Sequence, residues 1–313
     1  MTDARRFRHE AAIYRSDDEL LAVAVPFLRE GVQAGEATLL GVDEREQRLI
    51  LDALGDTDGI TPLAWGEVYA SPYAALEWNH RTLNDLLANG APRVRVLGAV
   101  PSHGTAATWD GWARYEAAVN HLYGPLDVWS VCPYDTRRTA DDVLADVERT
   151  HTHLAAPDGG HVPIPAYTDP VAFLTERARQ AADPLEAEAP HVAERDPTPG
   201  EARRTVTALA KATFLDAATV ERLLLAVSEV VTNATVHGAP PVDLRGWATD
   251  DRIVVTVRDH GPGPDDPFVG FLPRRDQPGG LGLWITNQAC SRVALLPEPE
   301  GFTVRITVGA PPG

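Results

Sequence analysis

Short apolar runs alternate with amphipathic stretches through the first half of the chain. Three of the apolar runs have the composition of buried strands, at residues 37–42, 94–100 and 127–131. Apolar residues recur at helical spacing in the stretches around them, which are 17–34, 44–54, 73–89, 110–123 and 139–154. This alternation of strands with helices predicts an open, mostly parallel sheet with helices on both faces.

The composition changes after residue 155, where Pro, Ala, Glu and Asp become frequent up to about residue 199. One helix is predicted inside this stretch, because 169–179 begins with Asp and Pro and then carries apolar residues at helical spacing. We therefore interpret 157–195 as a proline-rich connector with one helix. It would join a first domain of residues 1–156 to a second domain of residues 196–313.

The second domain follows a different order of patterns. Helices are predicted at 199–213, from Asp216 to Gly238, and from Leu281 to about Val293. Strands are predicted at 242–249, 252–259 and 301–308. The first two strands are separated only by Asp250-Asp251, which indicates a hairpin. These elements predict an α/β sandwich with a mixed, largely antiparallel sheet that is covered on one face by helices.

The helix that ends at Gly238 carries two polar residues beside its apolar face. Glu229 and Asn233 are one turn apart, so their side chains emerge together at the border of the stripe that contains Val227 and Val230. A carboxylate and an amide in this position are suited to catalysis or ligand binding more than to solubility. The alternative is a solvated Glu and an Asn near a helix end, and this helix alone leaves both interpretations open.

Two glycine-containing stretches follow in the same domain. Asp259-His-Gly-Pro-Gly263 comes directly after a predicted strand, and Gly279-Gly-Leu-Gly-Leu283 opens a predicted helix. Glycines at a helix start leave backbone N–H groups free to approach phosphates, where the helix dipole favours negative charge. Each motif alone is common as a plain turn. The order of the three motifs within one segment makes the combination specific.

Residues of about 195–310 resemble the histidine-kinase-like ATPase fold, the superfamily of gyrase, Hsp90, histidine kinases and MutL. The residues that match its N box and its two glycine boxes are Glu229, Asn233, Asp259, Gly261, Gly263, Gly280, Leu281 and Gly282. The compact form of this segment is similar to anti-sigma-factor serine kinases of the RsbW and SpoIIAB type.

This resemblance implies ATP and Mg²⁺ as cofactors and a phosphoryl transfer that depends on positioning and charge stabilisation. Asn233 would be a Mg²⁺ ligand, and Glu229 would orient or deprotonate the attacking hydroxyl. Asp259 would select adenine, while the glycines would approach the base and hold the phosphates. Thr303 would support Asp259 or would be an ordinary strand threonine.

Residues 264–278 contain Pro264, Pro267, Pro273 and Pro278 and are expected to form a lid. Within this segment, Arg274 or Arg275 would contact the γ-phosphate, unless the segment is a solvated loop.

The resemblance also implies partners. The phosphate acceptor would be a serine or threonine of a STAS-type anti-anti-sigma protein, a sigma factor would be the second client, and a homodimer is a further expectation. One alternative is a sensor histidine kinase, which needs a helical hairpin with a phosphoacceptor histidine. The only His-Glu dipeptide, His9-Glu10, instead precedes a presumed strand. The other alternative is a non-catalytic ATP-binding module that sequesters a partner, and the intact Glu229 and Asn233 argue against it.

The first half resembles the MEDS sensory domain, a RecA/KaiC-like fold without the phosphate loop. The matching residues are His9, Tyr14, Arg95-Val-Leu-Gly98, Tyr115-Glu116, Val119-Asn120 and Cys132-Pro-Tyr-Asp135. Ala99, Val100 and Pro101 stand where that family usually has a Glu and a Trp. No G-x-x-x-x-G-K-[ST] motif occurs in this half, so a nucleotide site is not expected there.

Net charge, apolar stretches and cysteine content limit the functional classes to which the protein can belong. The net charge of −17 and the pI of about 4.9 argue against a direct nucleic-acid partner, because no basic stripe is available to neutralise phosphates. No apolar stretch approaches the length of a membrane span, and the first residues lack a signal core. Cys132 and Cys290 are the only cysteines and form no CxxC pair. We therefore expect a cytoplasmic protein without membrane contact, disulfide framework or zinc site.

Individual histidines and cysteines in the first half are interpreted as core or surface residues. His9 is an example, because single histidines more often fill space than bind a ligand. His151 and His153 are two residues apart on a predicted helix and face different ways, so they do not predict a metal site. Cys132 at a strand end is read as a small buried hydrophobic residue.

Overall fold

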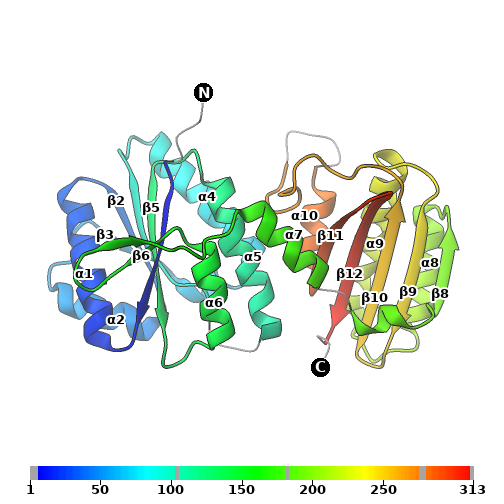
Figure 1. The fold of residues 1–313 in the computed structure, drawn as a ribbon, viewed down its shortest axis with the longest axis horizontal. Coiled ribbons are helices and arrows are strands. Elements are labelled where there is room, and N and C mark those ends of the chain that lie inside the picture. The colour runs from blue at the N-terminus through cyan, green and yellow to red at the C-terminus, as the bar shows by residue number, and fades with distance from the viewer. Residues whose placement is uncertain (1–5, 103–105, 181–182, 275–279, 311–313) are drawn as a thin grey trace. The chain divides into compact units, whose positions relative to one another are not determined.

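The computed structural model describes residues 6–102, 106–180, 183–274 and 280–310 of the chain. The chain divides into two compact units, Met1–Phe173 and Leu174–Gly313, and Figure 1 labels the elements of both. Within the described residues, no helix combines the length and the apolar character that crossing a membrane requires.

The first unit is built on a seven-stranded sheet with the order β3-β2-β4-β5-β1-β6-β7. The strands are β1 (Arg8–Tyr14), β2 (Ala37–Gly41), β3 (Ile60–Pro62), β4 (Val94–Gly98), β5 (Val128–Asp135), β6 (His153–Ala155) and β7 (His161–Pro163). All neighbouring strands are parallel except β6 and β7. The expected open, mostly parallel sheet is therefore confirmed. The edge strands β3 and β7 and the strand β6 beside β7 have only three residues each, too few for a recognisable pattern.

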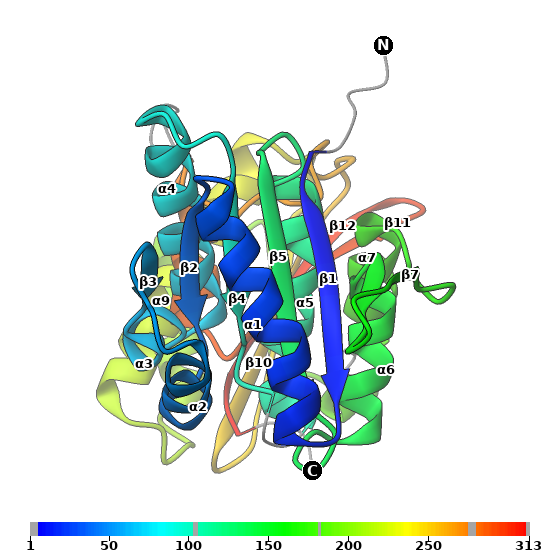
Figure 2. The same ribbon diagram turned by 90° about the vertical axis from the view of Figure 1, so that its left-hand side faces the viewer.

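Helices cover both faces of this sheet. An apolar core joins α1 (Asp17–Gln33) and α2 (Glu44–Leu54) to one face, and Figure 2 shows these helices in front of the strands. The helices that contribute to the other face are α4 (Pro72–Ala88), α5 (Ala106–Leu122) and α6 (Asp141–Thr150), and the short α3 (Trp65–Val68) precedes them. On this second face, the Tyr134 hydroxyl from β5 donates to Glu116 of α5.

The second unit has a five-stranded antiparallel sheet with the order β11-β12-β10-β9-β8. The strands are β8 (Val192–Arg195), β9 (Asp243–Ala248), β10 (Arg252–Asp259), β11 (Arg292–Glu298) and β12 (Gly301–Gly309). The helices α8 (Pro199–Ala210), α9 (Ala217–Val236) and α10 (Gly282–Ala289) follow the predicted order. Leu223, Val227 and Val230 of α9 are fully or almost fully buried in the core, together with Ile253 and Ile306 of the sheet.

The helix expected from Leu281 to about Val293 is shorter than predicted. It ends at Ala289, and residues Arg292–Glu298 form β11, which pairs with β12. The apolar run in this region fits a buried helix or a buried strand equally well by pattern alone. Pairing with the neighbouring strand, which is a non-local interaction, decides between the two.

Part of the expected connector belongs to the second unit. Val192–Arg195 form the edge strand β8, which pairs with β9. Upstream of it lie α7 (Pro170–Gln180) and a 3₁₀ helix, η1 (Pro184–Ala187). Ala178 packs with Leu296, and Arg305 forms an ion pair with Glu186. These contacts lie on the sheet face opposite the helices α8 to α10, so this sheet is covered on both faces and not only on the expected one.

One buried acid in the first unit has an unusual environment. Glu46 of α2 is 5% exposed, and its Oε1 accepts a 2.6 Å hydrogen bond from the Tyr14 hydroxyl. Burial raises the pKa of Glu46 to about 7. The native state therefore keeps a proton that the unfolded chain releases at lower pH.

We expect Glu46→Gln to stabilise the protein increasingly as pH rises from about 5 to about 8, by up to a few kcal/mol. The native protein binds more protons than the unfolded chain in this window, so the free energy of unfolding of the unaltered protein falls as pH rises through the native pKa. The amide removes this loss and still accepts from Tyr14. Urea unfolding at several pH values measures the effect. Glu44→Gln on the exposed side of the same helix is the control, and equal pH profiles for both variants would contradict the assignment.

Candidate functional site

A cavity of about 380 Å³ lies in the second unit, beside the last turns of α9, the end of β10 and the start of β12. Four of the predicted site residues line it: Asn233, Asp259, Gly263 and Gly280. Apolar walls are provided by Val257, Leu283, Phe302 and Val304. Residues from three separate segments of the sequence therefore meet around one space.

Asp259 is the last residue of β10 and is 6% exposed. Its Oδ1 accepts hydrogen bonds from the backbone N–H of Gly261, at 2.6 Å, and from that of Ala239, at 3.3 Å. The turn after β10 and the segment after α9 thus both bind the same carboxylate oxygen. This arrangement fixes the carboxylate at the wall of the cavity and leaves Oδ2 as its second acceptor.

Glycines allow the close approach of backbone to this carboxylate. A Cβ at Gly261 would lie 2.8 Å from Asp259 Oδ1, and a Cβ at Gly238 would clash with the same side chain. Gly263 has φ +76°, and a Cβ there would clash with the Phe302 ring. By sequence pattern, Gly238 is predicted only as a helix end. The structure shows that it also makes room for Asp259.

Glu229 lies one turn before Asn233 on α9 and is half-buried. A Cβ at Gly282 would lie 2.5 Å from Glu229 Oε2, so the carboxylate sits directly against the start of α10. Leu281 is the N-cap residue of α10, and its side chain is 36% exposed. The second glycine motif therefore meets the carboxylate of α9, with Gly280 in the cavity wall and Gly282 beside Glu229.

Thr303 lies away from the cavity. Its side chain is on the sheet face opposite Phe302 and Val304, because successive strand residues point to opposite faces. Its hydroxyl donates a 2.6 Å hydrogen bond to Glu298 Oε1. The structure therefore does not bring Thr303 to Asp259, and the interpretation as an ordinary strand threonine is the one that fits.

The segment expected to form a lid is described only in part. Arg274 lines the cavity and forms an ion pair with Asp266. Arg275 and Pro278 lie outside the described residues. Arg274 is thus the described arginine of this segment that reaches the cavity.

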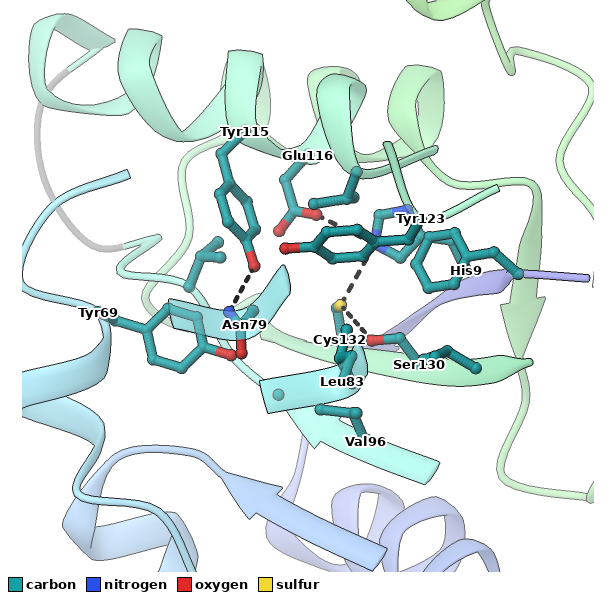
Figure 3. A pocket seen from close by; sticks show the side chains of 15 residues that line it. His9, Tyr69, Asn79, Leu83, Val96, Tyr115, Glu116, Tyr123, Ser130 and Cys132 are labelled. Carbon is teal, nitrogen blue, oxygen red and sulfur yellow. Dashed lines mark hydrogen bonds and ion pairs between the residues drawn. The ribbon is translucent and has the colours of Figure 1, made fainter. Parts of the chain in front are cut away.

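A second concentration of functional groups lies in the first unit. His9 of β1, Glu116 of α5, Cys132 of β5 and His151, just after α6, are all buried. One ligand atom from each lies within 4.8 Å of the others. Figure 3 shows three of them, His9, Glu116 and Cys132, around a small pocket that is also lined by Tyr69, Tyr115 and Tyr123. We call these four residues the buried cluster.

Burial shifts the proton affinities of the buried cluster. It lowers the pKa of His151 to about 3, with a further contribution from the neighbouring His9. It also raises the pKa of the Cys132 thiol well above its ordinary value, and the nearby Glu116 carboxylate adds to this effect. His151 is therefore neutral near pH 7, and without a cation nearby Cys132 is a thiol.

Sequence patterns do not predict the buried cluster. By pattern, His9 and Cys132 are interpreted as core residues, and His151 is considered only together with His153. The predicted helix through both histidines is wrong, because α6 ends at Thr150 and His153 begins β6. His153 contacts the Thr152 hydroxyl, whereas His151 faces Glu116. The signal that was needed is the pairing of β1 with β5, where His9 lies opposite Ser130 and Cys132 follows on the same face.

Comparisons with known proteins match the two halves of the chain to two different families. Residues 8–152 match the family described as MEDS, the methanogen/methylotroph DcmR sensory domain. Residues 193–308 match the family of the histidine kinase-like ATPase domain, which implies ATP binding. A search of curated proteins gave no match to the chain.

We expect Asp259→Asn to weaken ATP binding by about tenfold to a hundredfold, because the loss of a charged acceptor costs about 1.5–3 kcal/mol. The substitution keeps Oδ1 as an acceptor for Gly261 and Ala239 but replaces Oδ2 with a donor. Isothermal titration calorimetry with Mg·ATP measures the change. Asp265→Asn, at an exposed acid that also lines the cavity, is the matched control. Equal affinities for the two variants would remove Asp259 from adenine recognition.

Proposed function

From the succession of a MEDS sensory domain and a histidine kinase-like ATPase domain in one chain, we propose that this protein is an ATP-dependent serine/threonine kinase and anti-sigma factor. Its acceptor would be a STAS-type anti-anti-sigma protein and its second client a sigma factor. The first domain would govern this partner switching. The anti-sigma role and the partners rest on the resemblance of the second domain to RsbW-type kinases.

The observation that supports kinase chemistry best is the convergence of the three motifs. Asn233 and Asp259 line the same cavity, together with one glycine from each glycine motif. Glu229 lies against Gly282 at the start of α10. Neither a solvated helix end nor plain turns would require these residues to meet.

The cavity fits an adenine nucleotide by its size and its walls. Its volume of about 380 Å³ lies in the range of small-molecule sites, roughly 300–1,000 Å³. Val257, Phe302 and Val304 line the cavity and would give a purine an apolar surface, and Asp259 Oδ2 would accept a hydrogen bond from its exocyclic amine. Backbone N–H groups at the start of α10 would bind the phosphates, and Arg274 would supply a positive charge there.

The cavity also contains a suitable oxygen ligand for Mg²⁺. The Asn233 side chain offers a neutral amide oxygen, which is a hard ligand of the kind that Mg²⁺ accepts beside phosphate oxygens and water. When bound, Mg·ATP would supply the transferable phosphoryl group and the charge that activates it. The chain itself would hold the nucleotide and exclude water around the apolar walls.

Glu229 is the proposed catalytic base. It lies one helical turn from Asn233 on the same helix, so both side chains are positioned by the buried face of α9. From there its carboxylate would orient the hydroxyl of a serine or threonine and accept its proton.

The histidine-kinase alternative has less support. His9 of the only His-Glu dipeptide is 2% exposed and belongs to the buried cluster, so it is not placed to be phosphorylated by a partner or a second domain. Between the family-matched regions, the described residues contain α7, of 11 residues, and the 3₁₀ helix η1. Neither has the length of a dimerising helical hairpin.

We expect Asn233→Ala to remove the Mg²⁺-dependent part of the ATP affinity, because a metal ligand is lost. In the presence of Mg²⁺ the affinity should fall by at least about tenfold. Calorimetry in Mg²⁺ and in a chelator separates this part from the rest. The unaltered protein should bind more tightly in Mg²⁺, whereas the variant should show nearly equal affinities. A variant that keeps the full Mg²⁺ effect would exclude Asn233 as the metal ligand.

We expect Glu229→Gln to retain ATP binding and to lose transfer to a STAS partner by about a hundredfold or more, as for loss of a general base. Incubation with labelled ATP and a STAS protein, followed by acid treatment, measures the transfer. Glu221→Gln, at an exposed position two turns earlier on the same helix, is the control.

The chemistry of the label distinguishes the candidate functions. Acid-stable label on the STAS partner supports phosphoserine or phosphothreonine. Acid-labile label on the protein itself would support a histidine kinase. Tight ATP binding without any transfer would support the non-catalytic binding module.

A further inference from the structure

The buried cluster has the donor set and the spacing of a metal site. His9 Nε2 lies 3.1 Å from Glu116 Oε2 and 3.5 Å from Cys132 Sγ. His151 Nε2 lies 3.7 Å from the same Glu116 oxygen. The edges of a tetrahedral zinc site with nitrogen, oxygen and sulfur ligands are roughly 3.3–3.6 Å, as follows from its metal–ligand distances.

Two atoms of the buried cluster are buried without a hydrogen-bond partner. They are Glu116 Oε2 and His151 Nε2, whose side chains are both 0% exposed. His9 Nε2 lies 3.1 Å from Glu116 Oε2, which is ion-pair distance when the ring is protonated, and His151 Nε2 lies 3.7 Å from the same oxygen. Such an unsatisfied group costs about 1–3 kcal/mol and requires an explanation. A shared cation would satisfy both atoms.

Hydrogen bonds outside the buried cluster orient the histidine rings. The Asn120 amide donates to the carbonyls of Glu116, at 2.9 Å, and Thr150, at 2.7 Å. Its Oδ1 is therefore the acceptor for His9 Nδ1–H, at 3.3 Å. His151 Nδ1–H donates to the Val147 carbonyl at 2.9 Å. In its neutral form each ring thus carries its proton on Nδ1 and presents an Nε2 lone pair to the centre.

The carboxylate is oriented in the same way. The Tyr134 hydroxyl donates to Glu116 Oε1 at 2.8 Å, which leaves Oε2 directed to the centre. Lone pairs of two nitrogens, one oxygen and one sulfur then face one another. Facing lone pairs repel unless a proton or a cation lies between them. Partners that fix the tautomer and the orientation of ligands in this way are typical of metal sites.

We propose that His9, Glu116, Cys132 and His151 bind one divalent transition-metal ion of the zinc class in the first unit. Imidazole and thiolate donors favour this class over Mg²⁺ or Ca²⁺. On binding, the Cys132 thiol releases its proton to solvent, and its thiolate sulfur becomes a ligand. The ion would connect β1 and β5 of the sheet to α5 and to the residue after α6.

The test uses the full-length protein without a histidine tag, stripped with a chelator and titrated with Co²⁺ as a spectroscopic substitute for Zn²⁺. We expect one ion per chain, the visible spectrum of tetrahedral cobalt and a thiolate-to-cobalt charge-transfer band. Cys290→Ser should retain this band, and because the chain has only two cysteines the sulfur must then be Cys132. Absence of the band in Cys290→Ser would overturn the proposal.

Further variants test the nitrogen ligands. His151→Gln should weaken Co²⁺ and Zn²⁺ binding by at least about tenfold, whereas His153→Gln, two residues away, should not change it. Because His151→Gln is buried, near-ultraviolet circular dichroism checks that it is folded. If His151→Gln is not folded, the spectrum of Cys290→Ser still decides whether the buried cluster binds the metal ion. A cluster held only by hydrogen bonds would show neither stoichiometric metal nor a charge-transfer band.

Discussion

The second unit depends on the hydrogen bonds that one buried carboxylate accepts at the end of a strand. Asp259 Oδ1 binds two backbone N–H groups, from Gly261 after β10 and from Ala239 after α9. Without these bonds, burial of the charge would be costly. These two bonds hold together the end of α9, the turn after β10 and the end of β10. The close approach of the segments requires glycine at 238 and 261. The same geometry leaves the second oxygen of Asp259 at the wall of the cavity.

The helix α9 makes the rest of the site predictable from sequence. Its apolar positions fix which side faces the sheet, so Glu229 and Asn233 had to emerge together at the border of the core. Helix period and glycine positions are local properties, and they predicted four of the residues that line the cavity, Asn233, Asp259, Gly263 and Gly280. Thr303 was different, because its expected role depended on which face of β12 it occupied. Strand alternation placed it with Glu298 instead.

Non-local pairing explains what the sequence patterns could not predict. By pattern alone, the apolar residues of β11 look like a continuation of α10, and only their pairing with β12 identifies them as a strand. The proline-rich stretch read as a connector, although Glu186, Ala178 and β8 contact the sheet of the second unit. Predicting the buried cluster from sequence would require the relative positions of four separate segments of the chain. No spacing along the chain links His9 to Cys132, since the order of strands in the sheet brings them together.

The two faces of the sheet in the first unit differ in a way that bears on its role. The face under α1 and α2 has an apolar core that includes Leu20, Leu28 and Ile50, which stabilises the fold by ordinary burial. The face under α5 combines apolar residues such as Val119 and Val128 with the four polar side chains of the buried cluster. Polar groups of this kind contribute less to stability than apolar side chains of similar volume. The convergence of the four side chains of the buried cluster on one point, with ring orientations set by Asn120 and Val147, is therefore better explained by a bound ion than by packing.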